Sequence, residues 1–344
     1  MTFSVNGYTI VDTNRNASFA SANVSVSVGV LNNTTYTQAQ GTVSGYTSGG
    51  LTTAPPSTQT NTVDKFPFAT NSNASDVGDL TVARRLTSGQ SSTVSGYTSG
   101  GFIPSPTPTY YNTIDKFPFA TDANATTVGA LTVARNQATG HSSTVSGYTS
   151  GGYIGSAPNA GENTIDKFPF ASDVNATDVG DLTQFRYLVT GQSSTTSGYT
   201  SGGQSYPVPG NPVVYHNIID KFPFASNANA TDVGDLTRAT RAATGQSSSV
   251  SGYTSGGGTG GITNTIDKFS FATDTNATDV GDLIIIKEYA AGQSSTTYGY
   301  ITGGRAGGYV GTSNMQRFSF SVDANSTTVG DLTLSRTEVA GQQY

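Results

Sequence analysis

The chain repeats one segment six times, and the copies differ in length at only one place. Each copy carries the string Gly-Tyr-Thr-Ser-Gly-Gly or a close variant of it. The first glycine of the closing pair recurs at spacings of 51, 51, 51, 54 and 47 residues. These glycines are Gly49, Gly100, Gly151, Gly202, Gly256 and Gly303. A period of this length indicates a repeat architecture, in which each copy is one unit that packs on its neighbours.

The intervals within a copy separate a constant part from a variable one. From the aspartate of the Asp-Lys-Phe string to the glycine of the Val-Gly pair the interval is 14 residues, and from there to the glycine before Gln or His it is 11. From the second glycine of Gly-Gly to the aspartate position, the interval runs 14, 14, 14, 17, 10 and 12. The sequence therefore predicts a fixed scaffold with one variable loop in each copy.

The residue pattern favours strands throughout. Residues with high β propensity come in short bursts bounded by Gly, Pro, Asn and Asp, and no apolar run has a helical period. A period near fifty with several short strands per copy predicts an all-β, six-bladed β-propeller over residues 38–344. Residues 1–37 precede the repeats and are expected to form a short β or extended attachment segment.

One copy illustrates the expected blade. In residues 135–185 we predict strands at 141–145, 146–150, 163–171 and 179–186. Phe168 and Phe170 lie two residues apart, so both are expected to face the neighbouring blade. Pro169 between them cannot donate to a sheet, which predicts a bulge or an exposed edge there. The chain ends where a seventh copy would begin, so residues 340–344 are expected to pair beside residues 45–50 and close the ring.

Composition excludes several functions. The net charge is −6 and no Lys/Arg cluster occurs, which argues against nucleic acid as a partner. No stretch of about 20 apolar residues predicts a membrane span, and no secretion signal is evident. Cysteine is absent, histidine is limited to His141 and His216, and glutamate to Glu162, Glu288 and Glu338. We therefore expect no metal site, no cofactor and no enzymatic activity.

The repeat resembles a known family. Each copy looks like a Kelch repeat, and the resemblance covers about residues 38–344. The shared order is a basic residue, Gly-Tyr-x-x-Gly-Gly, a variable loop, a strand with an aromatic residue and then Val-x-x-Leu. The Kelch tryptophan is missing, with Val128 in the nearest place, so we describe the repeat as Kelch-like. SGYTSGG followed by NTIDKFPFATDANATDVGDL also resembles repeats of virion and tail-fibre proteins of marine, cyanophage-type bacteriophages, and residues 6–25 resemble a segment near fibre N-termini.

Three repeated polar features each allow two interpretations. The Gln series could line a channel that binds an ion, or could hydrogen-bond between strands; it comprises Gln90, His141, Gln192, Gln246, Gln293 and Gln342. The basic series could bind an anion, or could pair with Asp or carbonyls between blades; it comprises Arg84, Arg135, Arg186, Lys287 and Arg336, with Thr240 as the exception. The Asn-Ala-Thr strings match a glycosylation or calcium-loop pattern, although turns suffice to explain them.

The variable loops hold aromatic residues that break the repeat. These candidate ligand-binding residues are Phe102, Tyr110, Tyr111, Tyr153, Tyr206, Tyr215, His216 and Tyr309. In a four-stranded meander all six loops are expected at one face, where aromatic rings among small polar residues suit a sugar or protein surface. The resemblance implies a noncatalytic phage virion protein, exposed on the particle outside the cell, whose loops bind a host-surface glycan or receptor protein.

In that interpretation residues 1–37 attach the protein to other virion proteins or to sister chains in a homo-oligomer. The alternative is a purely structural virion protein, in the capsid decoration or the tail, whose loops contact other virion subunits. Packing of the loops on themselves is the simplest explanation of the aromatic residues without any ligand. A depolymerase using loop carboxylates is the enzymatic alternative, but the sequence offers no acid pair for it.

Overall fold

The computed structural model describes residues 40–53, 55–155, 161–206, 212–307 and 310–344, together with the backbone of residues 4–5 and 8–9. The chain divides into two compact units, residues 1–35 and residues 36–344. In the first unit β1 (Ser4–Val5) pairs antiparallel with β2 (Tyr8–Thr9). The expected attachment role of residues 1–37 otherwise falls outside the described residues. Among the described residues there is no α-helix, and hence none long enough to cross a bilayer.

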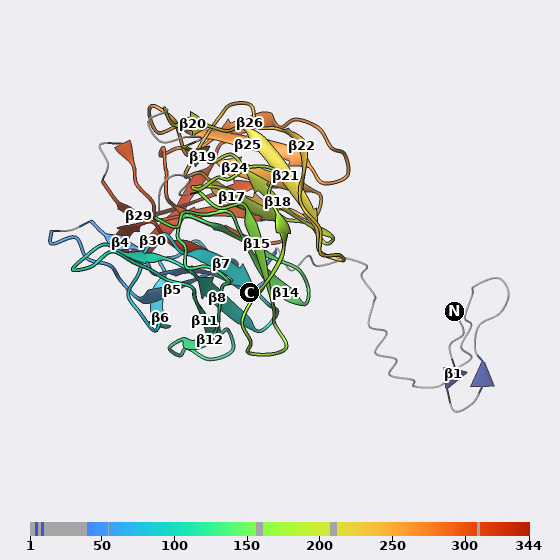
Figure 1. The fold of residues 1–344 in the computed structure, drawn as a ribbon, viewed down its shortest axis with the longest axis horizontal. Coiled ribbons are helices and arrows are strands. Elements are labelled where there is room, and N and C mark those ends of the chain that lie inside the picture. Colours follow the sequence, from blue (N-terminus) through green and yellow to red (C-terminus); the bar gives the residue numbers. More distant parts are fainter. Residues whose placement is uncertain are drawn as a thin grey trace. The chain divides into compact units, whose positions relative to one another are not determined.

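The second unit is a six-bladed β-propeller, as the repeat predicts (Figure 1). Each blade has four antiparallel strands, which we denote a to d from the axis outward. Blade 1 comprises β31 (Ala340–Gln343), β3 (Ser44–Ser48), β5 (Thr62–Pro67) and β6 (Ser75–Asp79). Blade 2 comprises β7 (Ser88–Ser91), β8 (Ser95–Ser99), β11 (Thr113–Pro118) and β12 (Thr126–Ala130). Blade 3 comprises β13 (Thr139–Ser142), β14 (Ser146–Ser150), β15 (Thr164–Pro169) and β16 (Thr177–Asp181).

The remaining blades follow the same order. Blade 4 comprises β17 (Thr190–Ser193), β18 (Ser197–Ser201), β21 (Ile218–Pro223) and β22 (Thr231–Asp235). Blade 5 comprises β23 (Thr244–Ser247), β24 (Ser251–Ser255), β25 (Thr265–Ser270) and β26 (Thr278–Asp282). Blade 6 comprises β27 (Ala291–Ser294), β28 (Tyr298–Thr302), β29 (Thr312–Ser319) and β30 (Thr327–Thr337). Two b–c loops form small hairpins, β9 (Phe102–Ile103) with β10 (Thr109–Tyr110) and β19 (Gln204–Ser205) with β20 (Val214–Tyr215).

The C-terminal strand closes the ring, which confirms the prediction made from the chain end. β31 pairs antiparallel with β3, with Tyr46 opposite Gln342 and Ser48 opposite Ala340. A second link joins the same two blades, because β30 extends far enough to pair with β4 (Leu51–Thr52). In Figure 1 the red β30 accordingly lies beside the blue β4. No blade in the described ring is left with an unpaired inner strand.

The predicted strands of blade 3 are correct for strand b, slightly too long for strand c, and shifted toward the C-terminus for strands a and d. Strand d ends at Asp181 and does not extend to Arg186. Its end is set by the next blade, because the backbone N–H and the hydroxyl of Thr183 both donate to the carboxylate of Asp220, at 3.0 and 2.7 Å. The chain is thereby drawn out of the sheet, an effect that local sequence does not reveal.

The expected bulge is present but lies elsewhere in strand c. Register between strands c and d shifts at Ile114 and Asp115 in blade 2, three residues before Pro118. Pro118 itself pairs with Ser95 of strand b, and strand d begins only at Thr126, opposite Lys116. Strand d has not yet begun beside Pro118, so no backbone carbonyl of strand d faces this position. The proline, which lacks an N–H, therefore removes no hydrogen bond between strands c and d.

The core lies in the seams between blades. Phe168 is 2% exposed and packs with Phe170 against Tyr97 of the preceding blade, with ring centroids 5.4 and 5.0 Å from the tyrosine. The same Phe, Phe and Tyr arrangement recurs at the other seams. Within the blade, a Cβ on Gly147 would lie 2.3 Å from the ring of Phe168. In each Gly-Tyr pair, the glycine thus leaves space for the first Phe ring of its own blade. The tyrosine contributes its ring to the seam with the next blade.

Candidate functional site

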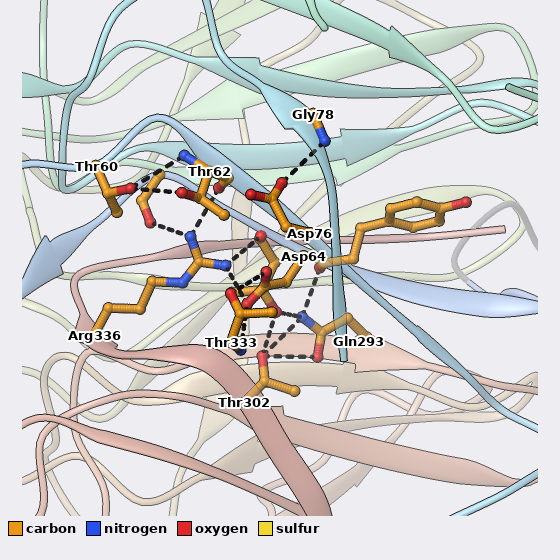
Figure 2. A network of polar contacts seen from close by, with 12 residues as sticks. Thr60, Thr62, Asp64, Asp76, Gly78, Gln293, Thr302, Thr333 and Arg336 are labelled. Atoms are coloured by element: carbon orange, nitrogen blue, oxygen red, sulfur yellow. Dashed lines mark hydrogen bonds and ion pairs between the residues drawn. The ribbon is translucent and has the colours of Figure 1, made fainter. Parts of the chain in front are cut away.

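Buried ion pairs join most neighbouring blades and account for the basic series. Arg336 donates to Asp64 of the next blade at 3.0 Å and to backbone carbonyls at Thr47, Gly49 and Thr62 (Figure 2). Thr333 donates its N–H and its hydroxyl to the same carboxylate. Equivalent pairs join Arg84 to Asp115, Arg135 to Asp166 and Arg186 to Asp220. These arginines therefore form ion pairs between blades and do not form an anion site.

Two seams break this rule, and each lacks one partner. Thr240 replaces the arginine opposite Asp267, whose carboxylate accepts from the N–H and hydroxyl of Thr237 and whose pKa is raised by burial. At the next seam Gln316 replaces the aspartate opposite Lys287. The Lys287 ammonium donates instead to the Asn314 carbonyl, and burial lowers its pKa to about 7. These two seams carry uncompensated ionisable groups.

The Gln series hydrogen-bonds between strands, the second of the two interpretations. The amide of Gln90 donates to Ser99 of its own blade and to Thr149 of the next, both at 2.9 Å. His141 takes the same place in blade 3, where its Nε2 lies 2.8 Å from the Ser150 hydroxyl. Burial lowers the pKa of His141 to about 4. The donors therefore point into the seams and not along the axis.

A closed ring of backbone hydrogen bonds surrounds the axis on one face. The connections from strand d to strand a each contain a non-glycine residue with φ between 52° and 61°. Each of these residues donates its N–H to the carbonyl of the equivalent residue in the preceding blade, at 2.8 to 3.0 Å. They are Leu86, Gln137, Leu188, Ala242, Tyr289 and Glu338. The left-handed conformation, which costs such residues of order 1–3 kcal/mol, is held by this ring.

The variable loops lie on the same face as that ring. The residue after each Gly-Gly pairs with the d–a connection beside it, as Phe102 does with Arg85 and Tyr153 with Asn136. The structure thus confirms that the loops gather at one face of the propeller, and we call it the loop face. The a–b turns lie at the opposite face, where Gly41 also donates to the carbonyl of Ser294.

Five aromatic side chains form a continuous row across the loop face. Ring centroids are 4.9 Å apart from Phe102 to Tyr110, 6.2 Å from Tyr110 to Tyr153, 5.0 Å from Tyr153 to Tyr187 and 6.1 Å from Tyr187 to Tyr206. Tyr206 is 44% exposed and Tyr187 is buried, with the other three between these extremes. We call this row the aromatic stripe; it runs over blades 2, 3 and 4.

The other predicted loop residues lie apart from the stripe. Tyr111 is stacked beside the buried guanidinium of Arg84, 5.9 Å from it. His216 is buried and its Nε2 lies 2.8 Å from the Ser205 hydroxyl, which makes it part of the loop's own structure. Tyr215 is half-buried in the β19–β20 hairpin. Tyr309 falls outside the described residues.

A group of charged side chains occupies the rest of the loop face. Arg305 donates twice to Glu288, at 2.7 and 2.9 Å, and its guanidinium lies 4.9 Å from the ring of Tyr289. Arg241 donates to the Tyr289 hydroxyl at 2.8 Å. Arg85 forms an ion pair with Glu338 at 3.0 Å. Arg85 borders the stripe, since its guanidinium lies 5.8 Å from the ring of Phe102.

Sequence reasoning missed the d–a connections as a source of loop-face residues. Tyr187 and Tyr289 lie one and two residues after the basic position of their copies. A signal was present, because the two residues that follow that position differ in chemical type from copy to copy: Arg-Leu, Asn-Gln, Tyr-Leu, Arg-Ala, Glu-Tyr and Thr-Glu. The residue types at these two positions vary between copies as much as those of the variable loops do, although the length of the d–a connection is constant.

Comparison with models of known protein families and with curated proteins gave no match. Within the described part of the chain, no three His, Cys, Asp or Glu side chains come together in a way that could hold a metal ion.

Proposed function

We propose that the protein is a noncatalytic phage virion protein, a tail-fibre or appendage component, that binds a host-surface glycan through the loop face. The observation that carries the binding role is the aromatic stripe. Its residues are absent from the repeat pattern, yet they lie in contact across three blades. Stability does not require such a row, since blades 5, 6 and 1 keep the same scaffold without it.

The composition of the stripe suits a polar ligand with apolar faces. Tyrosine offers a large rigid surface at a small cost in side-chain entropy, and its hydroxyl remains able to hydrogen-bond. Sugars present both C–H faces and hydroxyl groups, so the accessible rings of Tyr110, Tyr153 and Tyr206 match their chemistry. The assignment to a phage virion depends on the resemblance of the repeats to those of cyanophage-type tail-fibre proteins.

The position of the first described propeller residues is compatible with this role. Gln40 and Gly41 hydrogen-bond to the carbonyls of Ser295 and Ser294, at the face opposite the loops. The first described residues of the propeller therefore lie at the face opposite the proposed binding surface.

Adsorption of the purified protein to host cells tests the proposal. Replacing the stripe residues Phe102, Tyr110 and Tyr153 together by Ala is expected to weaken adsorption more than tenfold, since aromatic anchors at an interface contribute about 2 kcal/mol or more each. Tyr206→Ser is a second variant, because this exposed side chain can be changed without disturbing the core. Thr196→Val on the opposite face is the matched control, since Val94, Val145 and Val250 occupy the equivalent position.

Unchanged adsorption of the folded triple variant would refute the binding role. If the same variants instead failed to be incorporated into particles, the loop face would serve contacts with other virion subunits. That outcome would favour the purely structural alternative.

A further inference from the structure

One arginine of the loop face has no carboxylate partner. The group of charged side chains on this face contains three arginines and two glutamates. Arg85 pairs with Glu338, and Arg305 pairs with Glu288. Arg241 forms no ion pair with any described residue, and its hydrogen bond goes to a tyrosine. One positive charge of the group is therefore left without a counter-charge in contact with it.

The guanidinium of Arg241 is half-buried and keeps one donor open. Its Nη1 donates to the Tyr289 hydroxyl at 2.8 Å, and its Nε is enclosed. Its Nη2 has no hydrogen-bond partner among the described residues, and it is not one of their enclosed, unpartnered polar atoms. Burial acts to lower the pKa of Arg241, but Tyr289 and Glu288 act to raise it, and the net shift is upward. The group therefore stays charged and presents Nη2 to solvent.

The variable loop of blade 5 leaves space beside this arginine. It is the shortest of the six loops, and its backbone pairs with Arg241 at Gly258. Residues 256–261 contain five glycines and Thr259. A Cβ placed on Gly260 would meet no atom within 4 Å. This part of the loop therefore contributes no large side chain that covers the guanidinium.

The repeat does not require an arginine at this position. The equivalent residues of the other copies are Arg85, Asn136, Tyr187, Glu288 and Thr337. The scaffold thus accepts basic, acidic, aromatic and small polar side chains there. Residues that vary on a constant scaffold are the ones free to serve recognition.

The variable loops do not share the acidic excess of the chain. The net charge of the protein is −6, but the six loops contain no aspartate and no lysine. Their charged residues are Glu162 and Arg305. Glu162 belongs to blade 3, where its carboxylate accepts from the Thr164 hydroxyl at 3.1 Å. An anionic group that approaches Arg241 therefore meets little repulsion from the loops themselves.

The position of Arg241 links it to the aromatic stripe. Tyr289, which accepts its hydrogen bond, packs against the buried cluster that contains Tyr187. The stripe residue Tyr153 packs against the same cluster. A ligand lying on the stripe can therefore extend toward the open donor of Arg241.

We infer that the loop face recognises an acidic glycan, with a carboxylate or sulfate group bound by Arg241 and the adjoining sugar rings on the aromatic stripe. Arginine suits this role because its planar guanidinium stays ionised and forms charge-assisted hydrogen bonds with oxyanions, which are about twice as strong as neutral ones. The inference rests on the proposed function and names the class of glycan that it takes.

The test uses the full chain and two matched sets of oligosaccharides. Oligogalacturonides carry carboxylates, and their methyl esters present the same sugars without the charge. Dextran sulfate and dextran form the corresponding set for sulfate. Titration calorimetry is expected to show tighter binding of the charged member in at least one set, and that set identifies the acidic group.

Arg241→Gln is expected to weaken binding of the charged oligosaccharide about tenfold, as the loss of a hydrogen bond to a charged group implies. Binding of the neutral counterpart should stay unchanged. Arg238→Gln is the matched control, because it removes the same charge three residues away, from a guanidinium that donates to the Thr265 hydroxyl at 2.6 Å. Thermal unfolding checks that both variants fold.

The outcomes separate this inference from the proposed function. Equal weakening by Arg241→Gln and Arg238→Gln would overturn the inference, because a general effect of net charge would then explain it. Host adsorption that depends on the stripe but is unchanged in Arg241→Gln would also overturn it, and the proposed function would stand. Adsorption that depends on neither the stripe nor Arg241 would refute the proposed function, and the inference with it.

Discussion

Arg336 and Asp64, 272 positions apart in the chain, form an ion pair of 3.0 Å across the seam between the last blade and the first. Both side chains are fully buried. The pair closes the ring with the same contact that joins blades 1, 2, 3 and 4 to one another. The ring closure is therefore made by the repeat's own chemistry and by the C-terminal strand together.

Asp64→Asn is expected to destabilise the propeller by about 3–5 kcal/mol, because it leaves the Arg336 guanidinium buried without a counter-charge. Asp267→Asn is the matched control, since Thr240 stands where its arginine would be, and its cost should stay near 1 kcal/mol. Urea unfolding of both variants measures the difference. Equal losses would show that the ion pair contributes no more than the threonine contacts.

The seam of Lys287 and Gln316 can be given the missing pair. Lys287→Arg with Gln316→Asp recreates the arrangement found at four other seams, and the two changes are expected to couple favourably by roughly 1–3 kcal/mol. Lys287→Arg alone should destabilise, because a buried guanidinium cannot lose its proton as the lysine can. A double-mutant cycle by chemical denaturation measures the coupling, and additive single effects would argue against the proposed pairing.

His141 is expected to make stability depend on pH. Its pKa is lowered to about 4 by burial, below the 6.5 of the unfolded chain, so the unfolded state binds the proton more tightly. The stability contributed by the neutral ring is complete above pH 6.5 and is lost as the pH falls toward 4, by up to roughly 3 kcal/mol.

His141→Gln restores the residue found in the other five copies and should flatten this part of the stability profile. Unfolding free energies of both proteins between pH 4 and pH 7 provide the measurement. A profile that keeps its slope in the variant would assign the effect to carboxylates elsewhere.

A chain that ends at Arg336 lacks β31 and exposes the edge of β3. Loss of the strand and of the Gln342 bridge to Thr98 is expected to cost several kcal/mol, a fall in Tm on the order of 10 °C for a domain of this size. Removing residues 1–35, a separate compact unit, should leave the Tm nearly unchanged. A truncated protein with wild-type Tm would contradict closure by the C-terminal strand.

The sequence by itself determined the architecture of this protein. The constant intervals determined the number of blades, and the paired Phe positions determined which rings pack against the neighbouring blade. These features could be predicted because each is repeated six times. Differences between single copies can then be told apart from the residues and spacings that all copies share.

Only the tertiary structure decided which residues form the loop face. Tyr187 and Tyr289 lie outside the variable loops, yet Tyr289 and the loop residue Tyr153 pack against the same buried cluster as Tyr187, because the d–a connections lie beside the loops on one face. The end of strand d and the partners of the Gln series were likewise set by the neighbouring blade. Contacts between copies depend on how the blades are placed around the axis. The spacing of residues within one copy does not indicate the distance between residues of neighbouring blades.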